Sequence, residues 1–165
     1  MACALCAAML LCSCGNNTSE ESEADGRVAG SVCDLVAEAG DVSFKLPLAL
    51  SEMPESMMLK NERTRDGKKT AECFINDAFF GYVTISDDRI TAFDEDVVLA
   101  GCAQGDFSFG KMMYGAKRSE IEDEYGAAVL YSYQTSEEAY YFDDGRVILL
   151  YAGEKLMHLS VEYSG

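Results

Sequence analysis

Residues 139–151 read AYYFDDGRVILLY, and they place two apolar runs on either side of an Asp-Asp-Gly turn. Ala139–Phe142 and Arg146–Tyr151 are rich in aromatic and branched residues, which suit a pleated, half-buried surface. The turn between them supplies residue types that tolerate a positive φ in a tight connection. The stretch therefore predicts an antiparallel hairpin.

Short apolar runs and acidic or glycine turns continue on both sides of this hairpin. Leu156–Tyr163 follows it after the turn Gly153-Glu154, and Val129–Tyr133 precedes it. Upstream, the turn Arg65-Asp66-Gly67-Lys68 predicts another hairpin. The same pattern predicts further strands at Asp41–Leu48, Ala71–Ile75, Phe79–Ser86 and Val97–Leu99, and through Ile90–Phe93 and Phe107–Phe109.

One helix is predicted between the two groups of strands. Ser119 is placed as its N-cap, because Glu122 follows three residues later as in a capping box. Ile121 and Tyr125 lie one turn apart on an apolar face, and Gly126 supplies a left-handed stop. A shorter helical turn is expected at 51–55, and 32–39 fits a short helix or a strand.

The two halves of the chain match each other without a gap when Asp87 is placed over Gly153, a shift of 66 residues. The same shift brings Phe74 over Tyr140 and Val83 over Leu149. The expected fold class is therefore α+β, with short helices packed on one face of an antiparallel β-meander. A tandem repeat of helix-plus-meander units is the arrangement that this match suggests.

Two segments of the second half resemble the β-lactamase-inhibitor-like group. Gly115–Gly126 is a glycine and a capped helix that ends in glycine, and Glu138–Val147 is a tyrosine-rich strand with its turn. This group includes small outer-membrane assembly lipoproteins of the SmpA/OmlA type. The resemblance implies helices on one face of an antiparallel sheet, in proteins that bind other proteins and catalyse nothing. The chain departs from the group at Ala127 and Ala128, where a proline often follows the helix.

The chain begins with an uncharged apolar run from Met1 to Cys14. Such a run is too short to span a bilayer, which takes about 20 residues, but it has the length of a signal-peptide apolar region. Its ending, Leu11-Cys12-Ser13-Cys14, resembles the lipobox of bacterial lipoproteins. The resemblance implies cleavage after Ser13 and a covalent diacylglyceryl and acyl lipid on Cys14, with no other cofactor.

No Lys or Arg precedes Cys14, although signal peptides open with positive charge, so we expect the true start to lie upstream of Met1. Two other interpretations of the segment stay open. Cys3, Cys6, Cys12 and Cys14 have a spacing that could hold zinc or serve a redox function, and the run could be a buried helix. Its apolar flanks favour the lipobox over a thiolate site.

Charge limits the partners of the chain. A formal charge of −16 argues against nucleic acid or an anionic lipid surface, since both are polyanions. Two interpretations of the charge stay open: an acidic face that suits a basic partner, or a charge that serves solubility and repulsion from the cell surface. The polar residues 15–30 are expected to form a solvated acidic tether. Cys33, Cys73 and Cys102 would remain besides Cys14 after cleavage, so at most one disulfide can form among them.

Motifs for catalysis are few. His158 is the only histidine of the chain, and no nucleophile with a supporting local motif accompanies it. The acidic clusters 94–96 and 143–144 lack the alternate spacing of a helix–loop–helix calcium site. We therefore expect no catalytic residues and no metal site.

Tyrosines supply the one candidate binding face, formed by Tyr131, Tyr133, Tyr140, Tyr141 and Tyr151 in the last strands. Because Tyr140 and Tyr141 are adjacent in a strand, they point to opposite faces of the sheet. Tyrosine is enriched in protein-binding surfaces, although it is also a common strand residue. The face that no helix covers is therefore the expected binding face.

Four parts are predicted: a signal peptide at 1–13, a lipidated cysteine and acidic tether at 14–31, and α+β halves at 32–110 and 111–165. The expected protein is a non-catalytic binding module for a protein or ligand, held by its lipid on the extracytoplasmic side of the bacterial cell membrane. Two alternatives stay open: a structural subunit of an envelope assembly complex, and an enzyme of unknown type.

Overall fold

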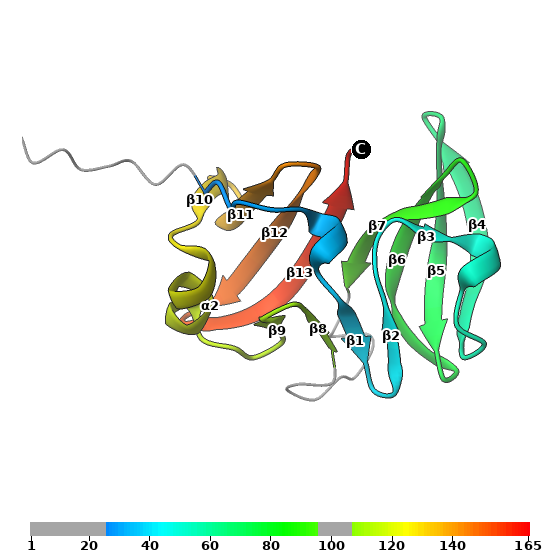
Figure 1. Cartoon of the computed structure of the whole chain (residues 1–165), viewed down its shortest axis with the longest axis horizontal. Helices are drawn as coiled ribbons and strands as arrows, with labels where there is room; N and C mark the ends of the chain where they lie inside the picture. The colour runs from blue at the N-terminus through cyan, green and yellow to red at the C-terminus, as the bar shows by residue number, and fades with distance from the viewer. Residues whose placement is uncertain (1–25, 96–106) are drawn as a thin grey trace, which may run out of the picture.

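A computed structural model describes residues 26–95 and 107–165 (Figure 1). Its elements, in chain order, are η1 (Val32–Asp34), β1 (Ala37–Ala39), β2 (Val42–Phe44), β3 (Leu48–Ala49), η2 (Leu50–Glu52), β4 (Met57–Arg65), β5 (Lys68–Ile75), β6 (Ala78–Ser86), β7 (Arg89–Glu95), β8 (Phe107–Phe109), β9 (Met112–Met113), α2 (Arg118–Tyr125), β10 (Val129–Ser132), β11 (Glu137–Phe142), β12 (Gly145–Ala152) and β13 (Lys155–Tyr163). The elements η1 and η2 are single 3₁₀ turns.

These strands form two antiparallel sheets. The larger one has nine strands in the order β10-β11-β12-β13-β7-β6-β5-β4, with the short β3 beside β7. The smaller one has the order β2-β1-β8-β9. In Figure 1 the small sheet lies in front of the middle of the large one. The chain is therefore a two-layer β structure in which each half supplies a meander to the large sheet.

The two meanders share a register. Both the β6–β7 and the β12–β13 hairpin shift register at one point, after Thr84 in the first and after Leu150 in the second, which are 66 residues apart. In the strands that precede these hairpins, β5 and β11, the residues that correspond in the structure are 67 positions apart instead of 66. There Cys73 pairs with Gly81, and Tyr140 pairs with Val147, the residue 66 positions after Gly81, so the structural counterpart of Tyr140 is Cys73 and not Phe74. The predicted superposition of Phe74 on Tyr140 is wrong by one residue.

The predicted α+β class, with short helices on one face of a meander, is wrong. Strands make up 57% of the structure and helices 11%, and α2 is the one α-helix among the described residues. The small sheet covers the inner face of the large one instead: Phe107 stacks on Phe93 of β7 with ring centroids 5.1 Å apart, and Phe44 lies 6.0 Å from the same ring. A repeat of helix-plus-meander units is therefore not what the chain forms.

The expected helical turn of the first half is short for a local reason. It is reduced to η2, because Met53, the residue before Pro54, adopts an extended ψ of 135°. The apolar residues that follow Pro54 then pair with β5 as the strand β4. The hairpin predicted at Arg65-Asp66-Gly67-Lys68 is confirmed by that pairing.

The helix α2 begins earlier than the sequence suggested. Its N-cap is Lys117 rather than Ser119, because the Glu120 carboxylate accepts a hydrogen bond from the Lys117 N–H at 3.0 Å. The predicted stop is confirmed: Gly126 has a φ of 79° and its N–H donates to the Glu122 carbonyl at 2.8 Å. Ile121 is fully buried.

The structure shows which elements residues 32–39 and 41–48 form. Residues 32–39 form the 3₁₀ turn η1 and then the strand β1, so both predicted states occur. Asp41–Leu48 is split between β2 and β3, and Val42, Phe44 and Leu46 are all buried as one face. The predicted strand 97–99 lies outside the described residues.

Candidate functional site

The five predicted tyrosines lie on different sides of the large sheet. Tyr140 is fully buried on the inner side, where its hydroxyl donates to the Gly126 carbonyl at 2.7 Å. Tyr151 is half-buried, with the guanidinium of Arg118 4.5 Å above its ring. Burial raises the pKa of Tyr140 to about 12 and raises that of Tyr151 as well. These two side chains belong to the interior and not to a binding surface.

The other three tyrosines are exposed. Tyr141 is 36% exposed, Tyr131 39% and Tyr133 89%. Tyr141 therefore faces outward as its buried neighbour Tyr140 faces inward, which confirms that the two point to opposite faces. Tyr133 lies in the turn that follows β10, with its side chain almost wholly in solvent. The predicted binding face is reduced to Tyr131 and Tyr141.

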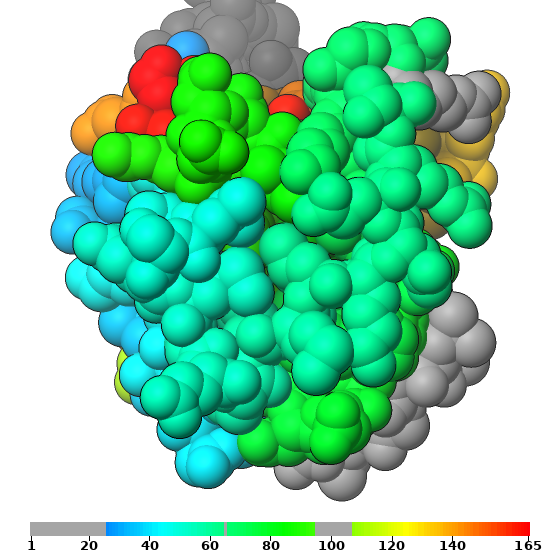
Figure 2. All heavy atoms as spheres, turned by 90° about the vertical axis from the view of Figure 1, so that its right-hand side faces the viewer, coloured from blue at the N-terminus to red at the C-terminus, as the bar shows by residue number. Residues whose placement is uncertain are grey.

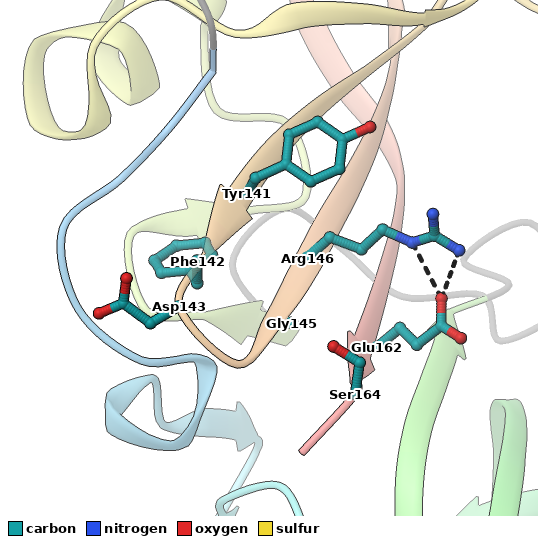
Figure 3. Close-up of a pocket in the computed structure, with 7 residues that line it drawn as sticks. All are labelled: Tyr141, Phe142, Asp143, Gly145, Arg146, Glu162 and Ser164. Atoms are coloured by element: carbon teal, nitrogen blue, oxygen red, sulfur yellow. Dashed lines mark hydrogen bonds and ion pairs between the residues drawn. The ribbon is translucent and has the colours of Figure 1, made fainter.

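An arginine joins these two tyrosines. Arg146 lies directly opposite Tyr141 in the β11–β12 pair, and its guanidinium lies 5.2 Å from the Tyr131 ring centroid. Its Nε and Nη2 both donate to Oε2 of Glu162, at 2.9 and 2.5 Å (Figure 3). We call Tyr131, Tyr141, Arg146 and Glu162 the tyrosine–arginine patch. It lies on the outer face of the large sheet, across β10 to β13.

A pocket of about 380 Å³ opens beside the patch. Figure 3 shows that Tyr141, Arg146 and Glu162 reach it from three strands, whereas Asp143 comes from the turn and Ser164 from the C-terminal end. The remaining lining is Phe142 and Gly145. Asp143 and Glu162 give the pocket two carboxylates against the one guanidinium of Arg146. The pocket is therefore acidic by one formal charge, although an arginine is its central side chain.

The N-terminal segment enters the fold beside this patch. The Tyr141 N–H donates to the Gly26 carbonyl at 2.8 Å, and the Val28 N–H donates to the Tyr141 carbonyl at 2.9 Å. Gly26 has a φ of +62°, and a Cβ there would lie 2.7 Å from the Ala139 carbonyl oxygen. Only glycine fits this close approach. The last residues of the predicted tether (14–31), from Gly26 onward, are thus fastened to the edge of the large sheet instead of forming part of a solvated tether.

Asp144 fastens the same segment a few residues later. Its carboxylate accepts hydrogen bonds from the Ser31 hydroxyl, from the Val32 N–H at 2.7 Å and from the Cys33 thiol at 2.9 Å. Desolvation opposes ionisation of this carboxyl, but the hydrogen bonds from Cys33, Ser31 and Val32 outweigh it and lower the pKa of Asp144. We call this contact the Asp144 clamp. It makes the acidic turn of the β11–β12 hairpin a structural fastening point.

The remaining candidates lie elsewhere. His158 Nε2 is 2.9 Å from Asp94 Oδ1, across the pair that joins β13 to β7. In the part of the chain that the structure describes, no group of three or more His, Cys, Asp or Glu side chains could hold a metal ion. Cys33 and Cys73 are free thiols, so they do not bond to each other. Cys102, Cys14 and the cysteines before it lie outside the described residues.

No helix within residues 26–95 and 107–165 is long and apolar enough to cross a membrane. No protein-family model matches the chain, and comparison with curated proteins and with solved structures also finds no match. The site must therefore be interpreted from its own geometry.

Three residues of the site, Arg146, Glu162 and Asp144, are not among those predicted from the sequence. Arg146 was recoverable, because a two-residue turn at Asp143-Asp144 places it opposite Tyr141 in the hairpin register. The bond between Asp144 and Ser31 was not recoverable, because 113 residues separate the two in the chain.

Proposed function

We propose that this chain is an extracytoplasmic lipoprotein, anchored through Cys14 to the bacterial cell membrane, and that its folded part is a non-catalytic module that binds a protein partner. The anchor rests on the residue pattern Leu11–Cys14, which lies outside the described residues. The binding function rests on one structural observation: two exposed tyrosines flank a fixed arginine where the chain enters the fold.

The residue types of the patch suit protein binding. Tyrosine and arginine dominate the energetics of many protein interfaces. The two bonds to Glu162 hold Arg146 in place, and β11, β12 and β13 beneath the patch are each paired on both sides, so little side-chain freedom is lost on binding. The acidic balance of the adjoining pocket favours a basic side chain of the partner, placed between Asp143 and Glu162. This agrees with the acidic charge of the whole chain.

The anchor would keep this surface close to the bilayer. Residues 14–25 span at most about 40 Å when fully extended, and the chain is fastened to the large sheet from Gly26 onward. Since Gly26 bonds to Tyr141, the point of attachment and the patch are neighbours. A partner bound there would lie within the tether's reach of the membrane.

Site-specific photocrosslinking in the native host tests this proposal. A photoreactive residue replaces Tyr141 in the full chain, and in a matched control it replaces Tyr82, which is 44% exposed in the other meander. We expect a discrete protein adduct from position 141, lost when Arg146→Ala is added, and none from position 82. Equal adducts from both positions, or an adduct that Arg146→Ala leaves unchanged, would contradict the proposal.

A further inference from the structure

One hairpin reverses the charge of this acidic chain. Residues 60–69 hold five of its 13 Lys and Arg residues and two of its 29 acidic residues, Glu62 and Asp66. The five basic residues are Lys60, Arg63, Arg65, Lys68 and Lys69. The segment therefore has a formal charge of +3, which leaves −19 on the rest of a chain with −16 in total. The net charge of the whole chain therefore gives no indication of this basic region.

This basic hairpin is the end of the large sheet. It consists of the tip of β4 and β5, and β4 is the last strand in the sheet order. Its tip projects at the upper right of Figure 1, and Figure 2, which faces this side of the molecule, shows the hairpin uncovered. Residues 60–64 and 66–68 are exposed. The edge of β4 is thus accessible to another chain.

The turn of the hairpin fixes which backbone groups face outward. Asp66 and Gly67 have φ values of 51° and 78°, as a two-residue type I′ turn requires. Arg65 and Lys68 are then a hydrogen-bonded pair, and the next pair, Thr64 with Lys69, is not hydrogen-bonded. The N–H and C=O of Thr64 therefore point away from β5, toward the open edge.

Part of the positive charge is already engaged within the hairpin. Lys69 Nζ lies 2.8 Å from Glu62 Oε2, and Lys60 Nζ lies 4.3 Å above the Phe74 ring. The pairing of β4 with β5 shifts register between Lys60 and Arg63, where Asn61 has a φ of 53°, so the regular part of the β4 edge is limited to 63–65 and the tip of the hairpin. Arg63 and Lys68 are exposed beside this regular part.

We propose that the open edge of β4 binds an acidic, extended segment of a partner protein, which adds to the large sheet as one more strand. Backbone bonds at Thr64 would supply the pairing, and Arg63 and Lys68 would select for carboxylates. Basic edge residues also keep the β4 edges of two copies apart, because like charges would face each other across the pair. The same charges thus reject a second copy and admit an acidic strand.

This surface is independent of the tyrosine–arginine patch. The patch adjoins β10 and suits a basic group, whereas the edge of β4 is the opposite end of the same sheet and suits an acidic one. The inference does not need the lipid anchor to hold.

The test uses the full chain, kept in solution with a nonionic detergent, and a fluorescent peptide as long as β4 in which Glu alternates with Val or Thr. The control peptide carries Lys in place of Glu. We expect the Glu peptide alone to bind by fluorescence anisotropy, with an affinity that falls as salt is added. Binding of both peptides alike, or of neither, would overturn the proposal.

Two variants separate charge from backbone pairing. Thr64→Pro removes the outward N–H and leaves the β4–β5 bonds in place, and we expect it to weaken binding about tenfold; Thr64→Val keeps that N–H and serves as its control. The double variant Arg63→Glu and Lys68→Glu should abolish binding of the Glu peptide. Unchanged affinity in the double variant, or equal affinity in Thr64→Pro and Thr64→Val, would overturn the proposal. Amide signals of β4 and β10 recorded with and without peptide give a second measurement, in which only β4 should shift.

Discussion

Ser160 lies directly opposite Asp94 in the antiparallel pair that joins β13 to β7. Their numbers differ by 66, the same shift that relates the β12–β13 hairpin to the β6–β7 hairpin. Ser160 and Asp94 are therefore counterparts that face each other, and a local two-fold axis between the two meanders passes through this pair. Because backbone pairing continues across that axis, the two halves share one sheet and one core.

Phe93→Ala should destabilise both halves together. Phe93 is 1% exposed at the seam, where its ring stacks on Phe107 at 5.1 Å. Removing a buried phenylalanine costs about 3–5 kcal/mol. We expect a loss of that size in the free energy of unfolding, measured by urea denaturation, with a single transition kept. Phe79→Ala on the partly exposed outer face is the control, and two separate transitions would show that the halves fold independently.

Tyr140→Phe should lower stability, whereas Tyr133→Phe should not. The Tyr140 hydroxyl donates to the Gly126 carbonyl at 2.7 Å, and its loss removes one hydrogen bond between β11 and the residue that ends α2. The expected cost is about 1 kcal/mol in the free energy of unfolding. Tyr133 is 89% exposed, so its hydroxyl contributes little. Equal effects of the two substitutions would contradict the placement of Tyr140 inside.

The Asp144 clamp should lose its contribution in acid. Hydrogen bonds from Cys33, Ser31 and Val32 hold the pKa of Asp144 below its ordinary value, against the opposing effect of desolvation. A carboxyl whose pKa is lower in the folded than in the unfolded state stabilises the fold above its unfolded pKa of about 3.9. That stabilisation is lost as the pH falls through the lower folded pKa.

Asp144→Asn isolates this effect from the many other carboxylates. The stability difference between the natural chain and the variant should be full near neutral pH and should shrink below about pH 4. Hydrogen exchange at the Val32 amide, which bonds to Asp144 at 2.7 Å, should be faster in the variant. A stability difference that stays constant down to the lowest pH would contradict the clamp.

Cys33 should be alkylated in the native protein and Cys73 should not. Burial raises the pKa of Cys73 to about 12, and its side chain is fully buried in the core. Burial and the bond to Asp144 also raise the pKa of Cys33, but this thiol is partly exposed. Iodoacetamide at pH 8, followed by peptide mapping, should label Cys33 slowly and Cys73 only after unfolding. Rapid labelling of Cys73 would contradict its burial.

The hairpins of the large sheet could be predicted because their turns carry a local signal. Asp87 and Asp88 both have a positive φ, which Asp tolerates better than most residues, and apolar residues alternate on either side. In the small sheet, β2 and β8 lie in segments that the sequence predicts as strands, whereas 32–39 fits a helix or a strand and β9 is not predicted. No turn signal indicates that these strands, two or three residues long, pair with one another as a second sheet. That is why helices were expected to cover a face that strands cover.

The binding surface, too, could be predicted only as far as local sequence patterns reach. Alternation fixed that Tyr140 and Tyr141 point to opposite faces, but it could not say which faces inward. That choice depends on the Gly126 carbonyl at the end of α2 and on the packing of Tyr125, whose ring lies 5.8 Å from that of Tyr140. Contacts of this kind form only when the whole fold is assembled.

The location of the chain is the premise of its proposed role, and mass spectrometry of the N-terminal peptide from the native host tests it most directly. We predict a peptide that begins at Cys14 and carries a diacylglyceryl group on its thiol. We also predict that the Cys14→Ala variant is no longer found in the membrane fraction. A chain that retains Met1–Ser13 with an unmodified Cys14 would contradict the anchor and, with it, the extracytoplasmic binding role.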